Sequence, residues 1–248
     1  MRCLNGSHCE LKIQQVLTVF HNRPKTRIIT FIGPVGVGKS TQMRLVKNYL
    51  KLRKVRVAET YIKSTHGLTY ILSRFLKASG FSEKVTYEDG YTKIYPTRAV
   101  IRRIFILWCF LDAFSISVKF LFRVQLPFWL GFTPLIEEGL MMTSFTYRMS
   151  LPRFFGTKPV SLPIVPNLIQ WTSEKNHVNI VIDASVDELR RRRTTRSFRQ
   201  KELSEYIAMQ KKWMRRLDSG NFVFIDSTDE TVLSVHRKIV AALEKKPH

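Results

Sequence analysis

The sequence predicts an α/β protein in which a parallel sheet of about five strands lies between two layers of helices. Apolar segments of strand length alternate with helical segments along the 248 residues. This order favours parallel strands joined by crossover helices, with helices on both faces of the sheet. A glycine-rich segment at residues 33–41 follows the first apolar run and opens a helix. The chain is long enough to bury one substantial core as a single domain.

The first half of the chain is divided by its apolar runs, its glycines and a proline. Strands are predicted at residues 27–32 and 54–60, where apolar residues run together or alternate with polar ones. Helices are predicted at residues 39–51, 65–78 and 97–126. Pro127 is expected to end the last helix, because proline lacks the N–H that a helix interior needs. Residues 79–96 carry glycines and charges, which indicates an excursion from the core.

The second half repeats the alternation. Strands are predicted at residues 132–137, 177–183 and 221–226. Helices are predicted directly after residue 137, at 186–217 with a break near 196–199, and at 228–245. Four prolines lie between residues 151 and 166, and this density predicts a loop.

The glycine-rich segment carries the most specific chemistry in the chain. Residues 33–41 read GPVGVGKST, a complete P-loop motif placed between a strand and a helix. Its glycines let successive N–H groups wrap a phosphate, and the helix start adds its positive dipole end. The motif predicts a three-layer P-loop nucleoside triphosphate hydrolase fold and the cofactors ATP and Mg²⁺. The expected nucleotide-binding residues are Gly33, Pro34, Val35, Gly36, Val37, Gly38, Lys39, Ser40 and Thr41.

The formal charge of +22 is unusually large and is concentrated in two regions. Residues 1–58 hold twelve Lys and Arg against one Glu, and residues 190–216 hold eleven against two. Such an excess attracts nucleic acid or anionic lipid through long-range fields, although a solvated basic surface is an equal alternative. The three cysteines form no disulfide framework, which favours a reducing, cytoplasmic location.

Residues 104–122 form a strongly apolar stretch that invites a membrane interpretation. Asp112 and Lys119 interrupt it, whereas a membrane span needs about 20 largely uncharged residues. A buried or subunit-interface helix is therefore favoured over a span. Its aromatic side chains also leave open a peripheral membrane contact, supported by the basic surface.

The order of these pieces resembles the thymidylate kinase family of P-loop nucleotide kinases. The resemblance runs from residue 27 to about residue 243, and only the P-loop is specific by itself. It implies an N-terminal extension at residues 1–26 and a kinase-like domain at 27–248, with a lid at about 190–205. It further implies transfer of the ATP γ-phosphate to a nucleoside monophosphate or a similar acceptor, and a homodimer formed through the 97–126 helix.

The resemblance also assigns roles to individual residues. Residues 135–140, LIEEGL, correspond to a family segment that contains an acidic residue and an arginine, and Glu138 falls at the acidic position. The expected catalytic residues are Lys39, Glu138, Arg192 and Arg196, with Ser40 and Glu138 at the metal. The expected acceptor-binding residues are Glu59, Asp112, Tyr147 and Arg148. Gly139 and Ala113 stand where the family has arginines, so thymidylate itself is a doubtful acceptor.

Several alternatives remain open from the sequence. Glu137 and Glu138 point to opposite faces of a strand, so only one of them is expected to act on the metal or the attacking oxygen. Asp112 fits a buried structural hydrogen bond as well as an acceptor site, and the basic run at residues 190–193 fits a solvated helix face. A P-loop ATPase or nucleotide-dependent module on nucleic acid or a membrane surface is the alternative function. A degenerate kinase that only binds nucleotide is a third.

Overall fold

A computed structural model describes residues 27–86, 92–175, 177–195, 204–217 and 221–245. Its centre is one five-stranded sheet with the strand order β2-β5-β1-β6-β7, and every neighbouring pair is parallel. The strands are β1 (Ile28–Ile32), β2 (Val57–Ile62), β5 (Thr133–Glu138), β6 (His177–Asp183) and β7 (Phe222–Asp226). The predicted parallel sheet is therefore confirmed, and the N-terminal extension lies outside the described residues.

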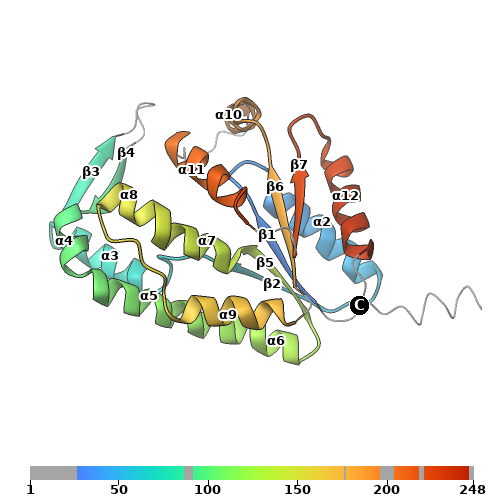
Figure 1. The fold of residues 1–248 in the computed structure, drawn as a ribbon, viewed down its shortest axis with the longest axis horizontal. Helices are drawn as coiled ribbons and strands as arrows, with labels where there is room; N and C mark the ends of the chain where they lie inside the picture. Colours follow the sequence, from blue (N-terminus) through green and yellow to red (C-terminus); the bar gives the residue numbers. More distant parts are fainter. Residues whose placement is uncertain (1–26, 87–91, 176, 196–203, 218–220, 246–248) are drawn as a thin grey trace, which may run out of the picture.

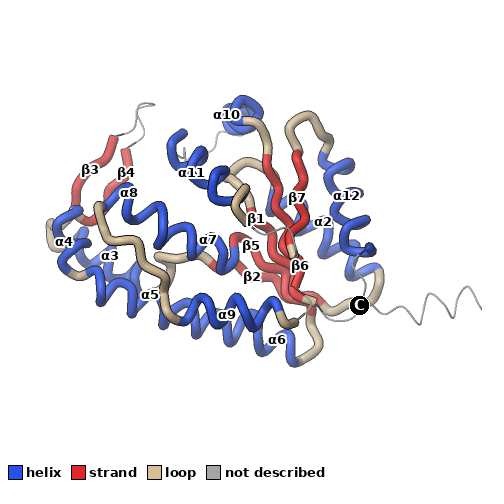
Figure 2. Tube along the Cα trace, in the orientation of Figure 1, coloured by secondary structure: helices blue, strands red, loops and turns tan. Residues whose placement is uncertain are grey.

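Helices cover both faces of the sheet, which completes the three-layer fold (Figure 1). One face carries α2 (Lys39–Leu52) and α12 (Val232–Lys245). The other face carries α5 (Phe105–Phe120), α7 (Gly139–Phe145) and α9 (Ile164–Ser173). The remaining helices are α3 (Leu68–Ala78), α4 (Arg98–Arg103), α6 (Leu126–Trp129), α8 (Leu151–Phe155), α10 (Val186–Thr195) and α11 (Ser204–Met214). Figure 2 shows α10 and α11 near the carboxyl ends of β6 and β7.

The core forms on both faces of the sheet because the central strands are buried at most positions, with apolar side chains directed to either side. β1 reads IITFI and all five of its residues are buried, as expected for a strand covered on both sides. Successive side chains point to opposite faces. Leu135 accordingly packs with Val46 and Leu50 of α2, whereas Ile136 packs with residues of α5 and α9.

Residues 79–96 form an excursion from the main sheet, as expected, and contain an antiparallel hairpin of β3 (Ser82–Thr86) and β4 (Thr92–Pro96). Two other expectations about local structure are wrong. Pro127 does not end the long helix: a π-helical turn, η1 (Leu121–Gln125), precedes it, and Pro127 is the second residue of α6, which continues the helix to Trp129. The proline-rich region is a loop only at 156–163. Helices flank it, because Pro152 and Pro166 both lie in first turns.

The helical segment from Phe105 to Trp129 is long and apolar enough to cross a membrane by length and composition alone. It packs on the sheet with one side only, and only 22% of its most apolar stretch is buried. Its buried row is spaced by four residues: Trp108, Asp112, Ile116, Phe120 and Val124. The opposite row remains exposed and includes Phe110 and Phe114, at 67% and 54%.

Candidate nucleotide-binding site

The P-loop lies at the carboxyl edge of the sheet, between the end of β1 and the start of α2. Gly33 is required there, because a Cβ at this position would lie 2.2 Å from the backbone oxygen of Ile182 in β6. The first turn of α2 has no acidic side chain, so its positive end is free to attract an anion. The sequence thus places a phosphate cradle where parallel α/β sheets bind ligands.

Lys39 is held inside this loop. Its ammonium group donates to the backbone oxygens of Gly33 and Pro34, at 2.8 and 3.0 Å. Its third neighbour is the Glu138 carboxylate, with Nζ and Oε1 3.4 Å apart and both side chains nearly buried. Two of the predicted catalytic residues are therefore brought together as an ion pair at the phosphate cradle.

Glu137 is the carboxylate that faces the P-loop serine. The Ser40 hydroxyl donates to its two oxygens at 2.9 and 3.1 Å. The sequence interpretation gave the metal role to Glu138, but the structure places Glu138 against Lys39 instead. The alternation of β5 could have indicated this: Glu137 shares the α2-facing side with Leu135.

Glu138 adopts an unusual backbone conformation, with φ 74° and ψ −60°. Positive φ values strain a residue that has a Cβ, and such strain clusters at functional sites. Gly139 follows with φ 72°, and an added Cβ there would lie 2.6 Å from Cγ2 of Thr30. The tight turn between β5 and α7 therefore explains why an arginine is missing at position 139.

A cavity of about 310 Å³ adjoins the P-loop, and its walls come from α2, α10 and the residues that lead into α12. Arg192 forms one wall, because its guanidinium donates to the backbone oxygens of Val37 and Ser227, at 3.4 and 2.5 Å. Glu188 orients this side chain through an ion pair of 2.7 Å. Hydrogen bonds from Arg191 and Arg192 lower the pKa of Glu188 to about 2, so it is ionised at neutral pH. The cavity is large enough for part of a nucleotide.

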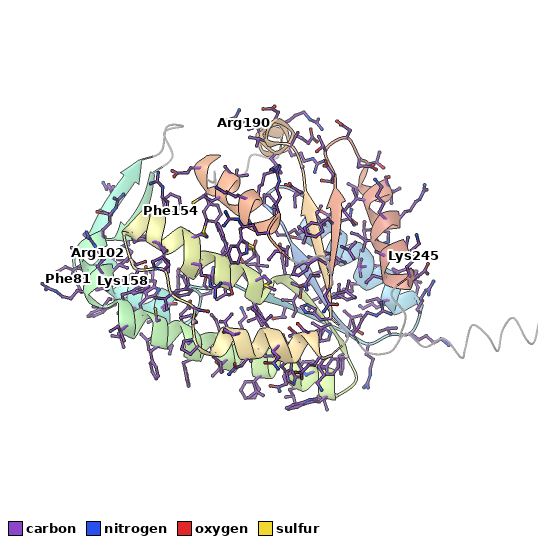
Figure 3. The ribbon with its side chains drawn as sticks, viewed as in Figure 1. Phe81, Arg102, Phe154, Lys158, Arg190 and Lys245 are labelled. Atoms are coloured by element: carbon purple, nitrogen blue, oxygen red, sulfur yellow. The ribbon has the colours of Figure 1, made fainter. Side chains whose placement is uncertain are left out.

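The basic helix α10 carries Arg192 at the P-loop but presents other arginines to solvent. Figure 3 shows Arg190 at the outer edge of the molecule on α10. Arg196, the second arginine expected to close over the phosphates, lies outside the described residues. In this basic run, Arg192 therefore fits the functional interpretation, whereas Arg190 fits the interpretation of a solvated helix face.

Asp112 and Tyr147 form a buried hydrogen-bond centre. Both side chains are 0% exposed, and the Tyr147 hydroxyl donates to Asp112 at 2.7 Å. Asp112 also accepts the hydroxyl of Thr69 at 2.9 Å and the backbone N–H of Thr65 at 2.9 Å. Burial raises the pKa of Asp112, and these hydrogen bonds oppose the shift. The arrangement is the buried structural hydrogen bond that the sequence left open, because neither side chain reaches a ligand-accessible surface.

The other residues expected at the acceptor do not gather at the P-loop. Glu59 lies in the middle of β2, opposite Leu135, and pairs with Lys47 of α2 at 2.7 Å. It is three residues short of the carboxyl edge of the sheet, so its acceptor role lacks structural support. Arg148 is exposed on the π-helical turn η2 (Thr146–Ser150).

Two polar side chains of α11 also lie at the carboxyl edge of the sheet, and the sequence analysis did not predict them. Gln210 is buried and donates to the backbone oxygen of Gly33 at 3.2 Å. Lys211 lies 3.1 Å from a carboxylate oxygen of Asp183 at the end of β6. Gln210 interrupts an otherwise apolar buried row between Ile207 and Met214, and this break in the helical pattern was the available signal.

The donor set suits magnesium better than a metal that needs a full protein cage. Among the described residues, no cluster of three or more His, Cys, Asp or Glu side chains is present. Mg²⁺ prefers oxygen ligands and is usually held by one or two protein groups together with phosphate oxygens and waters. Ser40 and Glu137 supply such groups beside the phosphate cradle.

No protein-family model matches the sequence, and no curated protein matches it either. Among solved structures, the chain is similar to the thymidylate kinase of Candida albicans, with 14% identity and a TM-score of 0.52. That match covers 89% of this chain and 92% of the other. The thymidylate kinase of Ehrlichia chaffeensis matches with 13% identity and a TM-score of 0.50, over 89% and 100% of the two chains. The protein therefore has the fold of the thymidylate kinases, as the order of its motifs predicts.

Proposed function

We propose that the protein is an ATP- and Mg²⁺-dependent nucleotide kinase that phosphorylates a nucleoside monophosphate or a similar acceptor. The observation that carries the proposal is that two P-loop side chains each pair with a different carboxylate of β5. Lys39 lies beside Glu138, and Ser40 lies beside Glu137. Phosphoryl transfer needs these parts: a phosphate cradle, a cation, a metal site and a carboxylate for the attacking group.

In the proposed reaction, an acceptor oxygen attacks the γ-phosphorus of ATP and ADP leaves. Backbone N–H groups of the P-loop and the start of α2 bind the phosphates, and Lys39 supplies positive charge to them. Ser40 and Glu137 would hold Mg²⁺, which neutralises phosphate charge when bound. Glu138, at the end of β5, is placed to orient the acceptor or take its proton. The base of ATP would occupy the cavity beside Arg192.

The acceptor side differs from that of the thymidylate kinases that the sequence resembles. The position expected to hold an arginine is Gly139, where φ is 72°. Asp112 and Tyr147 are engaged with each other in the core. These differences favour an acceptor other than thymidylate.

An acceptor panel tests the proposal directly. The purified protein is incubated with MgATP and each common ribo- and deoxyribonucleoside monophosphate, and ADP and diphosphate products are separated by chromatography. We expect ADP to form in equal amount to one diphosphate product. ATP hydrolysis without any diphosphate product would contradict a nucleotide kinase.

The two neighbouring carboxylates are expected to respond differently to the same substitution. Glu137→Gln removes a charge beside Ser40 and should raise the Mg²⁺ concentration for half-maximal activity by about 10–100-fold. Glu138→Gln should lower kcat without a comparable shift in the Mg²⁺ requirement. Mg²⁺ titrations of both variants measure this. An equal rise in the Mg²⁺ requirement of both variants would contradict the separate roles proposed for Glu137 and Glu138.

We also propose a homodimer formed through the α3–α5 face, defined here as the exposed apolar surface of α3, α5 and η1. Its members are Leu68, Ile71, Phe75, Ile106, Leu107, Phe110, Phe114, Val118, Leu121 and Phe122. Half-exposed side chains of this size expose on the order of 1,000 Å² in total. A standard interface buries about 800 Å² per partner, so this face is large enough for one. Apolar patches of this extent mark interaction sites.

Light scattering during gel filtration checks the dimer. We expect twice the chain mass of 29.0 kDa for the wild type. The double variant Phe110→Glu, Phe114→Glu should be monomeric, because it places charges in the middle of the face. Phe224→Glu, which alters a 49% exposed phenylalanine on edge strand β7, is the matched control and should remain dimeric. A monomeric wild type would exclude the proposed dimer.

The same face supports a second candidate function, a P-loop ATPase at an anionic membrane surface. Basic side chains lie around it, including Arg74 and Arg103, and Figure 3 shows Phe81 and Arg102 at the same end of the molecule. Apolar side chains with flanking cations are typical of surfaces that bind anionic lipid. This function predicts a monomer whose ATP hydrolysis increases with anionic vesicles and yields no diphosphate product.

A further inference from the structure

A second cavity, of about 330 Å³, lies on the sheet face that α7 and α9 cover. None of its lining residues lines the cavity beside Arg192 or belongs to the P-loop. Its polar wall comes from the first half of β6 and from β1: His177, Asn179 and Thr30. Its apolar wall includes Leu140 of α7 and Phe222 of β7. The proposed kinase reaction uses none of these side chains.

Asn179 is the feature of this cavity that calls for a ligand. The residue is 3% exposed, and its side-chain oxygen has no hydrogen-bond partner among the described residues. A buried polar group without a partner costs about 1–3 kcal/mol, which explains why such groups are rare in native proteins. The two neighbouring polar groups are already engaged, because Thr30 Oγ1 and His177 Nε2 lie 2.8 Å apart. The Asn179 oxygen therefore has no partner within the described fold, and the residue that carries it forms part of the cavity wall.

The lining of the cavity defines the chemistry of that molecule. Among the described residues that line it, no Asp, Glu, Lys or Arg is present, so a charged ligand would find no counter-charge. A carboxamide beside an imidazole, facing aliphatic and aromatic walls, suits a flat heterocycle that has hydrogen-bond donors on its edge. The volume lies at the small end of the range for ligand sites. An uncharged nucleobase or nucleoside combines these properties.

We propose that this cavity is a binding site for an uncharged nucleobase or nucleoside, recognised by the side chain of Asn179. The site is separate from the proposed ATP site and does not depend on catalysis. One wall residue of the cavity lies close to the proposed ATP site. Thr30 lines the cavity and packs against Gly139, which follows the strained Glu138. A ligand here contacts the base of the turn that carries Glu138.

Saturation-transfer NMR with uridine, cytidine, adenosine and guanosine tests the site without any enzyme assay. We expect saturable binding of at least one nucleoside to the wild type. Asn179→Leu, which keeps the side-chain size and removes the carboxamide, should weaken that binding at least about tenfold. Asn167→Leu makes the same change at an exposed position on α9 and should leave binding unchanged. Binding that persists in Lys39→Ala distinguishes this cavity from the ATP site.

Thermal unfolding of the same variants supplies an independent test. The Asn179 side-chain oxygen accepts no hydrogen bond from the described residues, so Asn179→Leu should keep or raise the Tm. A clear fall in Tm would show that Asn179 is a structural residue and would overturn the proposal. Failure of every nucleoside to bind the wild type would overturn it as well. Neither outcome affects the proposed kinase activity, which the acceptor panel tests.

Discussion

Lys39→Ala is expected to lower phosphoryl transfer by at least about 10²–10³-fold, the loss typical of removing one pre-positioned charge donor. The cause is loss of the only P-loop side chain that brings a positive charge to the outer phosphates. Initial rates with MgATP and the best acceptor measure the effect. Lys47→Ala is the matched control, because Lys47 lies on the same helix and pairs with Glu59 in mid-sheet. Unchanged transfer in Lys39→Ala would contradict the proposed function.

The structure adds a requirement to this experiment. Lys39 is the cation of a buried ion pair, and removing one partner of such a pair costs about 3–5 kcal/mol by leaving the other unpaired. A loss of activity in Lys39→Ala could therefore reflect unfolding. The double variant Lys39→Ala, Glu138→Gln removes both charges and should recover most of the stability without recovering activity. Urea unfolding of both variants separates the two effects.

Asp112→Ala is expected to lower the free energy of unfolding by about 3 kcal/mol or more. It leaves the donors of Thr65, Thr69 and Tyr147 buried without their acceptor, and each such donor costs about 1–3 kcal/mol. Domains of this kind have only about 5–15 kcal/mol of total stability. Urea unfolding measures the change. Ser117→Ala is the matched control on the same helix, because its hydroxyl bonds only to the oxygen of Ala113 one turn earlier.

The pH dependence of Asp112 has a defined sign. Burial raises the pKa of Asp112 above its ordinary value of 3.8, so the folded protein binds this proton more tightly than the unfolded chain. The contribution of Asp112 to stability therefore falls as pH rises from 3.8 through the raised pKa. Asp112→Asn cannot titrate. The stability advantage of the wild type over Asp112→Asn should be larger at about pH 4 than at about pH 7; a larger advantage at the higher pH would contradict this sign.

The predictable part of the fold rests on local signals. The strands at the centre of the sheet contain short apolar stretches, of which β1, IITFI, is the clearest, and the P-loop directly follows that strand. The hairpin of β3 and β4 was missed because its sequences, SEKVT and TKIYP, lack an apolar run. The helix end predicted at Pro127 was wrong because a π-helical turn before this residue shifts the hydrogen-bond pattern. The amino-acid composition gives no sign of such a turn.

The site was predictable only where one segment carries it. The nine P-loop residues lie together in sequence, and their identity by itself predicts that they bind a nucleotide. The roles of Glu137 and Glu138 depend on which face α2 covers, so tertiary packing decides between them. Asp112 and Tyr147 are 35 residues apart in sequence and meet through the packing of α5 against η2. Their identities alone fit an acceptor site and a core hydrogen bond equally well.

The turn at Gly139 constrains how this protein can change over evolution. Gaining the missing arginine requires a side chain at a residue with φ 72° and a Cβ 2.6 Å from Cγ2 of Thr30. Rotating Thr30 out of the way would break its contact with His177. An arginine at position 139 is thus harmful as long as Thr30 keeps this place and the turn keeps its positive φ. The turn therefore keeps an arginine from arising at this position through a single tolerated substitution.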